Sequence, residues 1–333
     1  MRRLALSLFL IITAGWLVSL AGCSGSSGGG GTAATGRKFR VAVIPKGTSH
    51  DFWYSVHAGA KQADDEFDDL EITWKGPASE GDIGEQIKMV ESFLADGYDG
   101  ICLAPLDARA MRKPVDQVLA AKVPVVIFDS GLDDASGIVS YVATNNYRGG
   151  QRAGEHLAKL LDGRGNVILM RYDLNSRSTE EREQGFLDAL AKFPDIKFLE
   201  RDKYAGPNES DAITLAENLL SVHGQQVNGI FCANQSTTSG MLTVLRRAGL
   251  AGKVKFIGFD AGENIAQGIE KGEVHGTVLQ DPVRMGYDAV RAMHDHLLGK
   301  KVDERIETQE ALATPENCHE PAIRALLYPK AIE

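Results

Sequence analysis

The sequence has few cysteines and none of the motifs that mark common enzyme classes. Its four cysteines, in 333 residues, show no C-x-x-C spacing, so neither a disulfide framework nor a zinc site is indicated. It has no G-x-S-x-G elbow, no H-E-x-x-H pair and no P-loop, and Gly163 and Gly165 lack the third glycine of a dinucleotide fingerprint. The eight histidines show no ligand spacing. These absences predict a protein that is not an enzyme and that uses no metal or cofactor.

An excess of basic residues is also missing. The formal net charge of −9 argues against nucleic acid as a partner, because neutralising phosphates requires a basic surface. Cys102 and Cys232 lie in apolar segments and are interpreted as core residues, whereas Cys318 could be a bridge or a free thiol.

The N-terminal segment is typical of export. Arg2 and Arg3 precede an apolar run over 4–20, which predicts a signal peptide over residues 1–22. The sequence Leu-Ala-Gly-Cys at 20–23 resembles the bacterial lipobox, in which the cysteine receives a lipid. We therefore expect an exported protein anchored to a membrane through Cys23. An ordinary secretory signal and a short membrane span are the alternatives.

The remaining chain is long enough for two lobes. Residues 23–37 are rich in glycine and serine and predict a flexible tether after the lipidated cysteine. About 300 residues follow, which exceeds what one core usually organises. We expect an N-terminal lobe of residues 38–143 plus 281–305, a C-terminal lobe of residues 144–280 plus 306–312, and a C-terminal extension over 313–333.

Short β-branched runs alternate with amphipathic helical stretches, a pattern that predicts parallel sheets built from βαβ units. In the helical stretch 84–95, for example, Ile87, Val90 and Leu94 form an apolar stripe. The strands are expected at 40–44, 72–74, 100–104, 123–128, 166–171, 196–199, 229–233 and 254–258. This number indicates an α/β fold with two doubly wound sheets.

A weak internal repeat relates the two halves. Residues 99–104 (DGICLA) resemble residues 228–233 (NGIFCA), and the strands that follow end in Phe-Asp-Ser-Gly and Phe-Asp-Ala-Gly. Asp129 and Asp260 therefore occupy equivalent positions after strands. Ligands bind outside the carboxyl ends of strands in open parallel sheets, so both aspartates are expected at one cleft between the lobes.

The loop after the first strand carries polar and aromatic side chains. It places Lys46 and His50 close to the adjacent aromatics Phe52 and Trp53. Flat rings beside fixed polar groups suit a sugar, whose C–H face packs on a ring while its hydroxyls form hydrogen bonds. Either aromatic could instead be a core residue at the start of a helix.

From Phe39 to about Glu307 the chain resembles the ribose type of the periplasmic binding protein family, the solute receptors of sugar ABC transporters. The resemblance is carried by His50–Trp53, Phe128–Asp129, Ser140–Gly150, Arg182–Phe186, Ala233–Asn234, Gly258–Asp260 and Gln280–Pro282. It implies two Rossmann-like lobes joined by a three-strand hinge, near 141–144, 280–282 and 305–308.

The resemblance also implies a set of ligand contacts. These are Lys46, His50, Phe52, Trp53, Asp129 and Ser130 from the first lobe, and Glu180, Arg182, Asn234, Asp260 and Gln280 from the second. Glu180 aligns with an arginine that clamps the ligand in many members, and Arg182 with a structural arginine, although a shift of register would exchange them. If Glu180 faces the cleft, an amino sugar becomes a candidate ligand. Asp129, Asn234 and Asp260 could instead serve as helix caps or turn residues.

The expected function is that of the solute-binding component of an ABC importer. The protein would bind a small carbohydrate or polyol as a monomer and deliver it to a permease, at the periplasmic or outer face of a bacterial membrane. One alternative is a receptor that passes its ligand-bound state to a membrane sensor. A less favoured alternative is a glycoside hydrolase of the cell envelope that uses Asp129 and Asp260 as its carboxylate pair.

Overall fold

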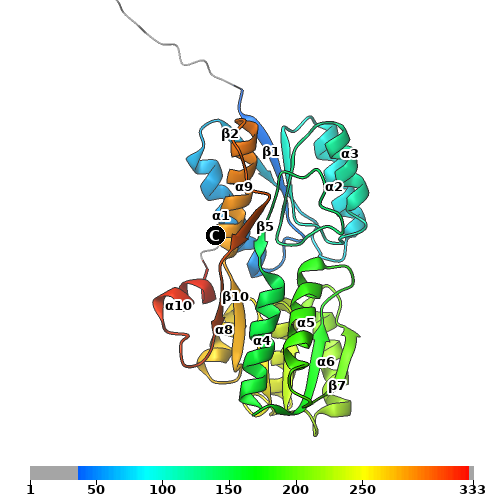
Figure 1. Ribbon diagram of the computed structural model, residues 1–333, viewed down its shortest axis with the longest axis vertical. Helices are drawn as coiled ribbons and strands as arrows, with labels where there is room; N and C mark the ends of the chain where they lie inside the picture. The colour runs from blue at the N-terminus through cyan, green and yellow to red at the C-terminus, as the bar shows by residue number, and fades with distance from the viewer. Residues whose placement is uncertain (1–36, 330–333) are drawn as a thin grey trace, which may run out of the picture. The chain divides into compact units, whose positions relative to one another are not determined.

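Both predicted sheets are present in the computed structural model, which describes residues 37–329. The sheet of the N-terminal lobe has the strand order β11-β5-β4-β3-β1-β2, and all of its strands are parallel. Its strands are β1 (Phe39–Ile44), β2 (Leu70–Trp74), β3 (Gly100–Leu103), β4 (Val125–Phe128), β5 (Ser140–Thr144) and β11 (Arg305–Thr308). This lobe occupies the upper half of Figure 1.

The sheet of the C-terminal lobe has the order β12-β10-β9-β8-β6-β7, and only β12 is antiparallel to its neighbour. Its strands are β6 (Arg164–Arg171), β7 (Asp195–Tyr204), β8 (Gly229–Cys232), β9 (Lys255–Phe259), β10 (Gly276–Gln280) and β12 (Glu310–Ala313). The central strands β3, β4 and β8 are buried at every residue. Such runs are apolar without alternation because helices cover both faces of a parallel sheet.

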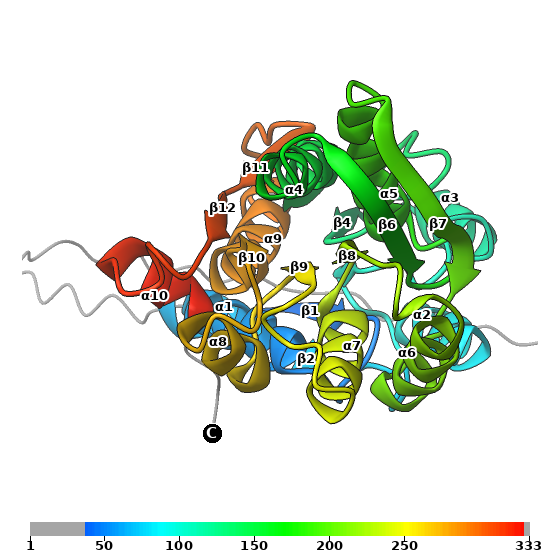
Figure 2. The same cartoon turned by 90° about the horizontal axis from the view of Figure 1, so that it is seen from below.

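Helices cover both faces of each sheet. In the N-terminal lobe, α1 (Asp51–Glu66) packs against α9 (Pro282–Leu297), and α2 (Ile83–Ala95) packs against α3 (Arg112–Ala120). In the C-terminal lobe, α4 (Asn146–Leu160) and α5 (Arg177–Leu190) cover one face. The other face carries α6 (Glu209–His223), α7 (Gln235–Arg247) and α8 (Glu263–Glu270). Figure 2 shows these two groups on opposite sides of the strands.

The chain crosses between the lobes three times. The first two crossings follow β5 and β10, as predicted. The third lies at Gln309, between β11 in one sheet and β12 in the other. The predicted boundary at 305/306 is therefore corrected, because β11 completes the N-terminal sheet by pairing with β5.

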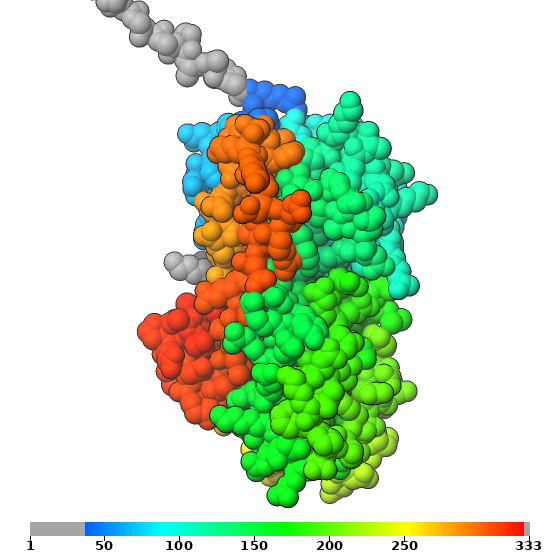
Figure 3. Space-filling model, viewed as in Figure 1, coloured from blue at the N-terminus to red at the C-terminus, as the bar shows by residue number. Residues whose placement is uncertain are grey.

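The described part of the predicted C-terminal extension belongs to the C-terminal lobe. Helix α10 (Pro321–Leu327) buries Leu326 and Leu327 in the core of that lobe, next to the buried Cys318. Figure 3 shows it as a bulge on the side of the lobe. The first described residue, Arg37, adjoins β1, so the described chain starts in one lobe and ends in the other.

Two sequence predictions on cysteines and membranes can be compared with the described residues. Cys102 and Cys232 are fully buried core residues, as expected, and within 37–329 all three cysteines are free. No helix of the described chain is both long and apolar enough to cross a membrane. The predicted signal peptide, the lipidated Cys23 and most of the tether lie outside the described residues.

Candidate ligand-binding site between the lobes

A narrow cavity of about 30 Å³ lies between the carboxyl ends of the two sheets. It is lined by Lys46, His50, Phe52, Trp53, Glu80, Asp129, Tyr172, Ser178, Thr179, Arg182, Asn234, Gln235, Asp260 and Gln280. Both lobes contribute to it, as expected for a ligand site at the strand ends of two doubly wound sheets. Its small free volume shows that the two lobes lie close together around these side chains.

The two aspartates of the internal repeat have the same unusual backbone conformation. Asp129 follows β4 with a φ of 59°, and Asp260 follows β9 with a φ of 72°. Residues other than glycine rarely adopt this left-handed region, although aspartate tolerates it better than most. Both turns direct a buried carboxylate toward the space between the lobes.

Each acid that lines the cavity has a cationic neighbour. Lys46 Nζ lies 3.6 Å from Asp129 Oδ2, and Arg182 Nη1 lies 3.6 Å from Asp260 Oδ2. His50 Nδ1 lies 2.6 Å from Glu80 Oε1. The lining therefore contains three acidic and three basic groups, so its charges are balanced when His50 is protonated.

Arg182 is held by several groups of the C-terminal lobe. Its Nε donates to Asn146 Oδ1 at 2.8 Å, its Nη1 donates to the Ala233 carbonyl at 3.0 Å, and its guanidinium stacks 3.9 Å from the ring centre of Phe259. Gly150 on α4 lets α5 come close, since a Cβ there would lie 1.9 Å from the Arg182 carbonyl oxygen. No hydrogen bond among residues 37–329 uses Nη2, so its two N–H groups remain for a ligand.

Glu80 joins three side chains through its two oxygens. Trp53 Nε1 and His50 contact Oε1, and Tyr172 Oη donates to Oε2 at 2.6 Å from the opposite lobe. Burial opposes the charged form of Glu80, but the hydrogen bond and charge of His50 outweigh it and lower its pKa to about 2. Because both oxygens are engaged, Glu80 holds Trp53 near the start of α1 and links the two lobes.

Other direct contacts also cross the cleft. Lys46 Nζ donates to Ser176 Oγ at 3.0 Å, and the backbone N–H of Ser178 donates to Ser130 Oγ at 3.1 Å. The backbone N–H of Phe52 donates to Gln235 Oε1 at 3.3 Å. The described structure therefore has its two lobes closed on each other.

Two groups in the cavity, the Asp129 carboxylate and Gln280 Oε1, still have unused hydrogen-bond acceptors. No hydrogen bond among the described residues uses a carboxylate oxygen of Asp129, and the buried Gln280 Oε1 has no partner there. Burial raises the pKa of Asp129, although the charges of Lys46 and Arg182 oppose that rise. Asp260 is more fully engaged, because it accepts from Gln280 Nε2 at 2.6 Å and from the Gln235 N–H at 2.9 Å.

Nine of the predicted contact residues line the cavity. They are Lys46, His50, Phe52, Trp53, Asp129, Arg182, Asn234, Asp260 and Gln280. Asn234 also caps α7, which confirms the alternative interpretation of that residue as a helix cap. Trp53 is a buried core residue near the start of α1, as the alternative interpretation expected, and its indole N–H donates to Glu80 Oε1.

Two predicted contacts do not line the cavity. The half-buried Glu180 accepts a hydrogen bond from the Asn175 N–H at 3.1 Å, at the start of α5. Residues two apart on a helix point about 200° apart, so Glu180 cannot share the cleft face with Arg182. Ser130 is buried beside the cavity, where its hydroxyl receives the Ser178 N–H.

Five lining residues were missed by the sequence analysis: Glu80, Tyr172, Ser178, Thr179 and Gln235. Glu80 and Tyr172 follow the carboxyl ends of β2 and β6, so the strand-end rule that selected Asp129 applies to them too. Among residues 37–329 no group of three or more histidine, cysteine or acidic side chains is placed to hold a metal.

A comparison with models of protein families identifies the family to which this two-lobed fold belongs. The model described as "Periplasmic binding protein domain" matches residues 41–301, which is most of the chain. The chain belongs to the periplasmic binding protein family. This membership confirms the resemblance and the two-lobed α/β fold that the sequence predicted.

Relatives of this periplasmic binding protein bind small polyols and sugars. The xylitol-binding protein of Mycolicibacterium smegmatis is 26% identical over 256 residues, which cover 76% of this chain and 71% of the relative. The D-ribose/D-allose-binding protein of Pseudomonas aeruginosa is 28% identical over 293 residues, which cover 85% and 91% of the two chains. These relatives confirm the prediction of a solute-binding protein that is not an enzyme.

Solved structures show the same fold. An ABC transporter solute binding protein from Agrobacterium vitis with bound D-fucose has a TM-score of 0.83 and 30% identity, and the match covers 87% of this chain and 100% of that one. The periplasmic component of an ABC-type sugar transport system from Hahella chejuensis has a TM-score of 0.79 and 33% identity, with coverage of 83% and 99%.

The pair of His50 and Glu80 predicts a pH dependence for this periplasmic binding protein. Burial opposes the charged form of His50, but Glu80 outweighs it and raises its pKa above the usual 6.5. A raised histidine pKa stabilises the folded state below 6.5, and that contribution is lost as pH rises through the raised pKa. The lowered pKa of Glu80 adds stability above 4.5 that is lost as pH falls to about 2.

We therefore expect the stabilisation by this pair to be largest between pH 4.5 and 6.5 and to decline above that range. The measurement is the thermal unfolding midpoint of the wild type and of His50→Asn across this range and up to about pH 9. The difference between the two should shrink as pH rises. His57→Asn is the control, since burial lowers the pKa of His57 and its removal should change the slope in the opposite sense. A pH-independent difference for His50→Asn would contradict the prediction.

Proposed function

We propose that this protein is the sugar- or polyol-binding component of an ABC importer, and that its ligand is a neutral molecule of monosaccharide size. The observation that carries the proposal is the combination of balanced charges with unused hydrogen-bonding atoms in the cavity. Asp129 and Gln280 Oε1 offer acceptors, and Arg182 Nη2 offers a donor. Hydroxyl groups can donate and accept at once, so a polyol uses both kinds of atom.

The balance of charge argues against an amino sugar. That ligand was attractive only while Glu180 was expected to face the cleft beside Asp129 and Asp260. With Glu180 outside the cavity and Lys46, His50 and Arg182 inside it, an added ammonium group would find no uncompensated acid. The aromatic rings of Phe52 and Trp53 further suit the C–H face of a sugar.

The contacts across the cleft suggest how binding is signalled to the transporter. A ligand that touches both lobes stabilises the closed arrangement, and hinge closure is the mode already described for periplasmic binding proteins. Closure would present both lobes to a permease in one fixed arrangement. We further propose that the protein acts as a monomer held at the membrane by a lipid on Cys23. Fatty-acid labelling that persists in Cys23→Ser would contradict this anchor.

The test is a thermal-shift screen of the purified protein against pentoses, hexoses, polyols, amino sugars and uronic acids. A ligand at about 100 times its Kd should stabilise the folded state by about 2.7 kcal/mol, which is a shift of several degrees. We expect the shifts to be confined to neutral sugars or polyols. Larger shifts with amino sugars than with their neutral parents would contradict the proposed ligand class.

A further inference from the structure

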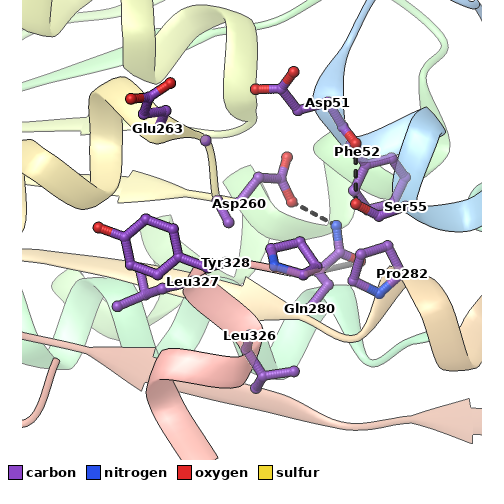
Figure 4. Close-up of a pocket in the computed structure, with 13 residues that line it drawn as sticks. Asp51, Phe52, Ser55, Asp260, Glu263, Gln280, Pro282, Leu326, Leu327 and Tyr328 are labelled. Carbon is purple, nitrogen blue, oxygen red and sulfur yellow. Dashed lines mark hydrogen bonds between the residues drawn. The ribbon is translucent and has the colours of Figure 1, made fainter. Parts of the chain in front are cut away.

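A second cavity of about 440 Å³ adjoins the sugar cleft, and its outer wall is formed by the end of α10 (Figure 4). Its apolar lining consists of Phe52, Pro282, Leu326, Leu327, Tyr328 and Pro329. We call it the α10 cavity. It lies where the chain crosses from β10 to α9, so residues of both lobes enclose it.

The α10 cavity shares part of its wall with the cleft between the lobes. Phe52, Asp260 and Gln280 line both spaces. Figure 4 shows Asp260 hydrogen-bonded to Gln280 at the α10 cavity, and the Oε1 of this buried glutamine has no partner among the described residues. A ligand bound to Gln280 in the cleft therefore lies within one side chain's thickness of the apolar space.

The chemistry of the α10 cavity differs from that of the cleft. Among residues 37–329, its charged lining residues are all acidic, namely Asp51, Asp260 and Glu263. Asp260 is paired with Arg182, but Asp51 and Glu263 form no ion pair within residues 37–329, so a phosphate or carboxylate group would be repelled there. An uncharged apolar group would instead bury its surface against the leucine, proline and aromatic side chains.

Tyr328, directly after α10, lines the α10 cavity and is partly exposed. Leu326 and Leu327 fix α10 in the core of the C-terminal lobe. Tyr328 is 38% exposed, its hydroxyl donates to Glu270 Oε1 at 3.0 Å, and Arg324 lies over its ring at 4.8 Å. These contacts hold the ring at the cavity rather than in the core.

We propose that the ligand is a glycoside or an alkyl- or aryl-substituted polyol, with its hydroxylated part in the cleft and its apolar substituent in the α10 cavity. This inference rests on the proposed function and narrows its substrate class. A neutral glycoside with an aromatic or short alkyl group would contact both spaces, whereas a free monosaccharide would contact only the cleft.

The test compares matched pairs of ligands by isothermal titration calorimetry. Each free sugar that stabilises the protein is measured beside its methyl and phenyl glycosides in both anomeric forms. We expect one phenyl glycoside to bind at least about tenfold tighter than the free sugar, because its ring is removed from water. Tyr328→Ala should abolish most of this gain and leave the affinity for the free sugar unchanged. Tyr328→Phe, which keeps the ring, should retain the gain.

Tyr147→Ala is a matched control in the same lobe. Tyr147 is also 38% exposed, and its hydroxyl donates to a single carboxylate, Asp188 at 2.8 Å, but it does not line either cavity. If free sugars bind and every glycoside binds equally or more weakly, the inference is wrong while the proposed function stands. If neither sugars nor glycosides bind, the proposed function fails and the inference fails with it.

Discussion

The substitution Asp129→Asn is expected to weaken sugar binding by about 100-fold or more, since hydrogen bonds to a charged group contribute about 1.5–3 kcal/mol each. Asp129 is the buried acid whose carboxylate oxygens remain free of hydrogen bonds within residues 37–329. A carboxylate can accept from two hydroxyls at once, whereas the amide presents one acceptor and one donor group. Asparagine keeps the size of the side chain and tolerates the left-handed backbone at this position.

The measurement is ligand affinity by calorimetry together with the unfolding midpoint of the ligand-free variant. Asp162→Asn is a matched control, because Asp162 also has a positive φ, of 50°, but is exposed in a turn outside the cavity. We expect that control to bind as the wild type does. An Asp129→Asn protein with unchanged affinity would remove this carboxylate from the binding site.

The substitution Arg182→Met is expected to destabilise the ligand-free protein by about 3–5 kcal/mol, because removing one partner of a buried ion pair leaves the other charge uncompensated. Arg182 is only 2% exposed, and its loss would leave Asp260 without its cation and Asn146 Oδ1 without its donor. Methionine fills much of the same space, so the loss is mainly electrostatic. Urea unfolding of the ligand-free protein measures this effect.

A double variant separates charge from packing. Arg182→Met combined with Asp260→Asn removes both charges, so we expect it to be more stable than the sum of the two single effects predicts. Arg247→Met is the control in the same lobe, since its ion pair with Glu217 is exposed and should contribute less than about 1 kcal/mol. Strictly additive effects at 182 and 260 would contradict the ion-pair explanation.

The fold was largely predictable from the sequence because its strands are short, buried and separated by helices. The runs around Val41, Ile101 and Ile230 contain no polar alternation, which is diagnostic of strands covered on both faces. The hinge was predicted less accurately. Sequence alone could not show that Arg305–Thr308 pairs with β5, because strand pairing between distant segments depends on the tertiary structure.

The residues of the candidate site were predictable where both lobes repeat the same sequence motif at the end of a strand. The repeat placed Asp129 and Asp260 at equivalent strand ends, and their shared left-handed conformation explains why the same residue type stands at both. The alignment of Glu180 failed for a local reason. Ser178, Thr179 and Arg182 form the buried face of α5, and Glu180 lies on the other side.

Glu80 and Tyr172 were missed because their role exists only in the closed arrangement. Neither belongs to a motif, and their hydrogen bond joins loops 92 residues apart on opposite lobes. Their positions after strands β2 and β6 were a signal, but a position after a strand does not by itself show that an acid such as Glu80 will be buried. Its environment is created by His50 and Trp53, which contact it from the start of α1.

The placement of the two ends of the described chain has a practical consequence. Arg37 adjoins the N-terminal lobe and α10 belongs to the C-terminal lobe, so the two positions move relative to each other whenever the hinge opens. A donor dye near Arg37 and an acceptor dye on the exposed face of α10 would therefore convert closure into a change in energy transfer. The protein could thus serve as a reagentless fluorescent sensor for its own ligand, without any change to the cleft.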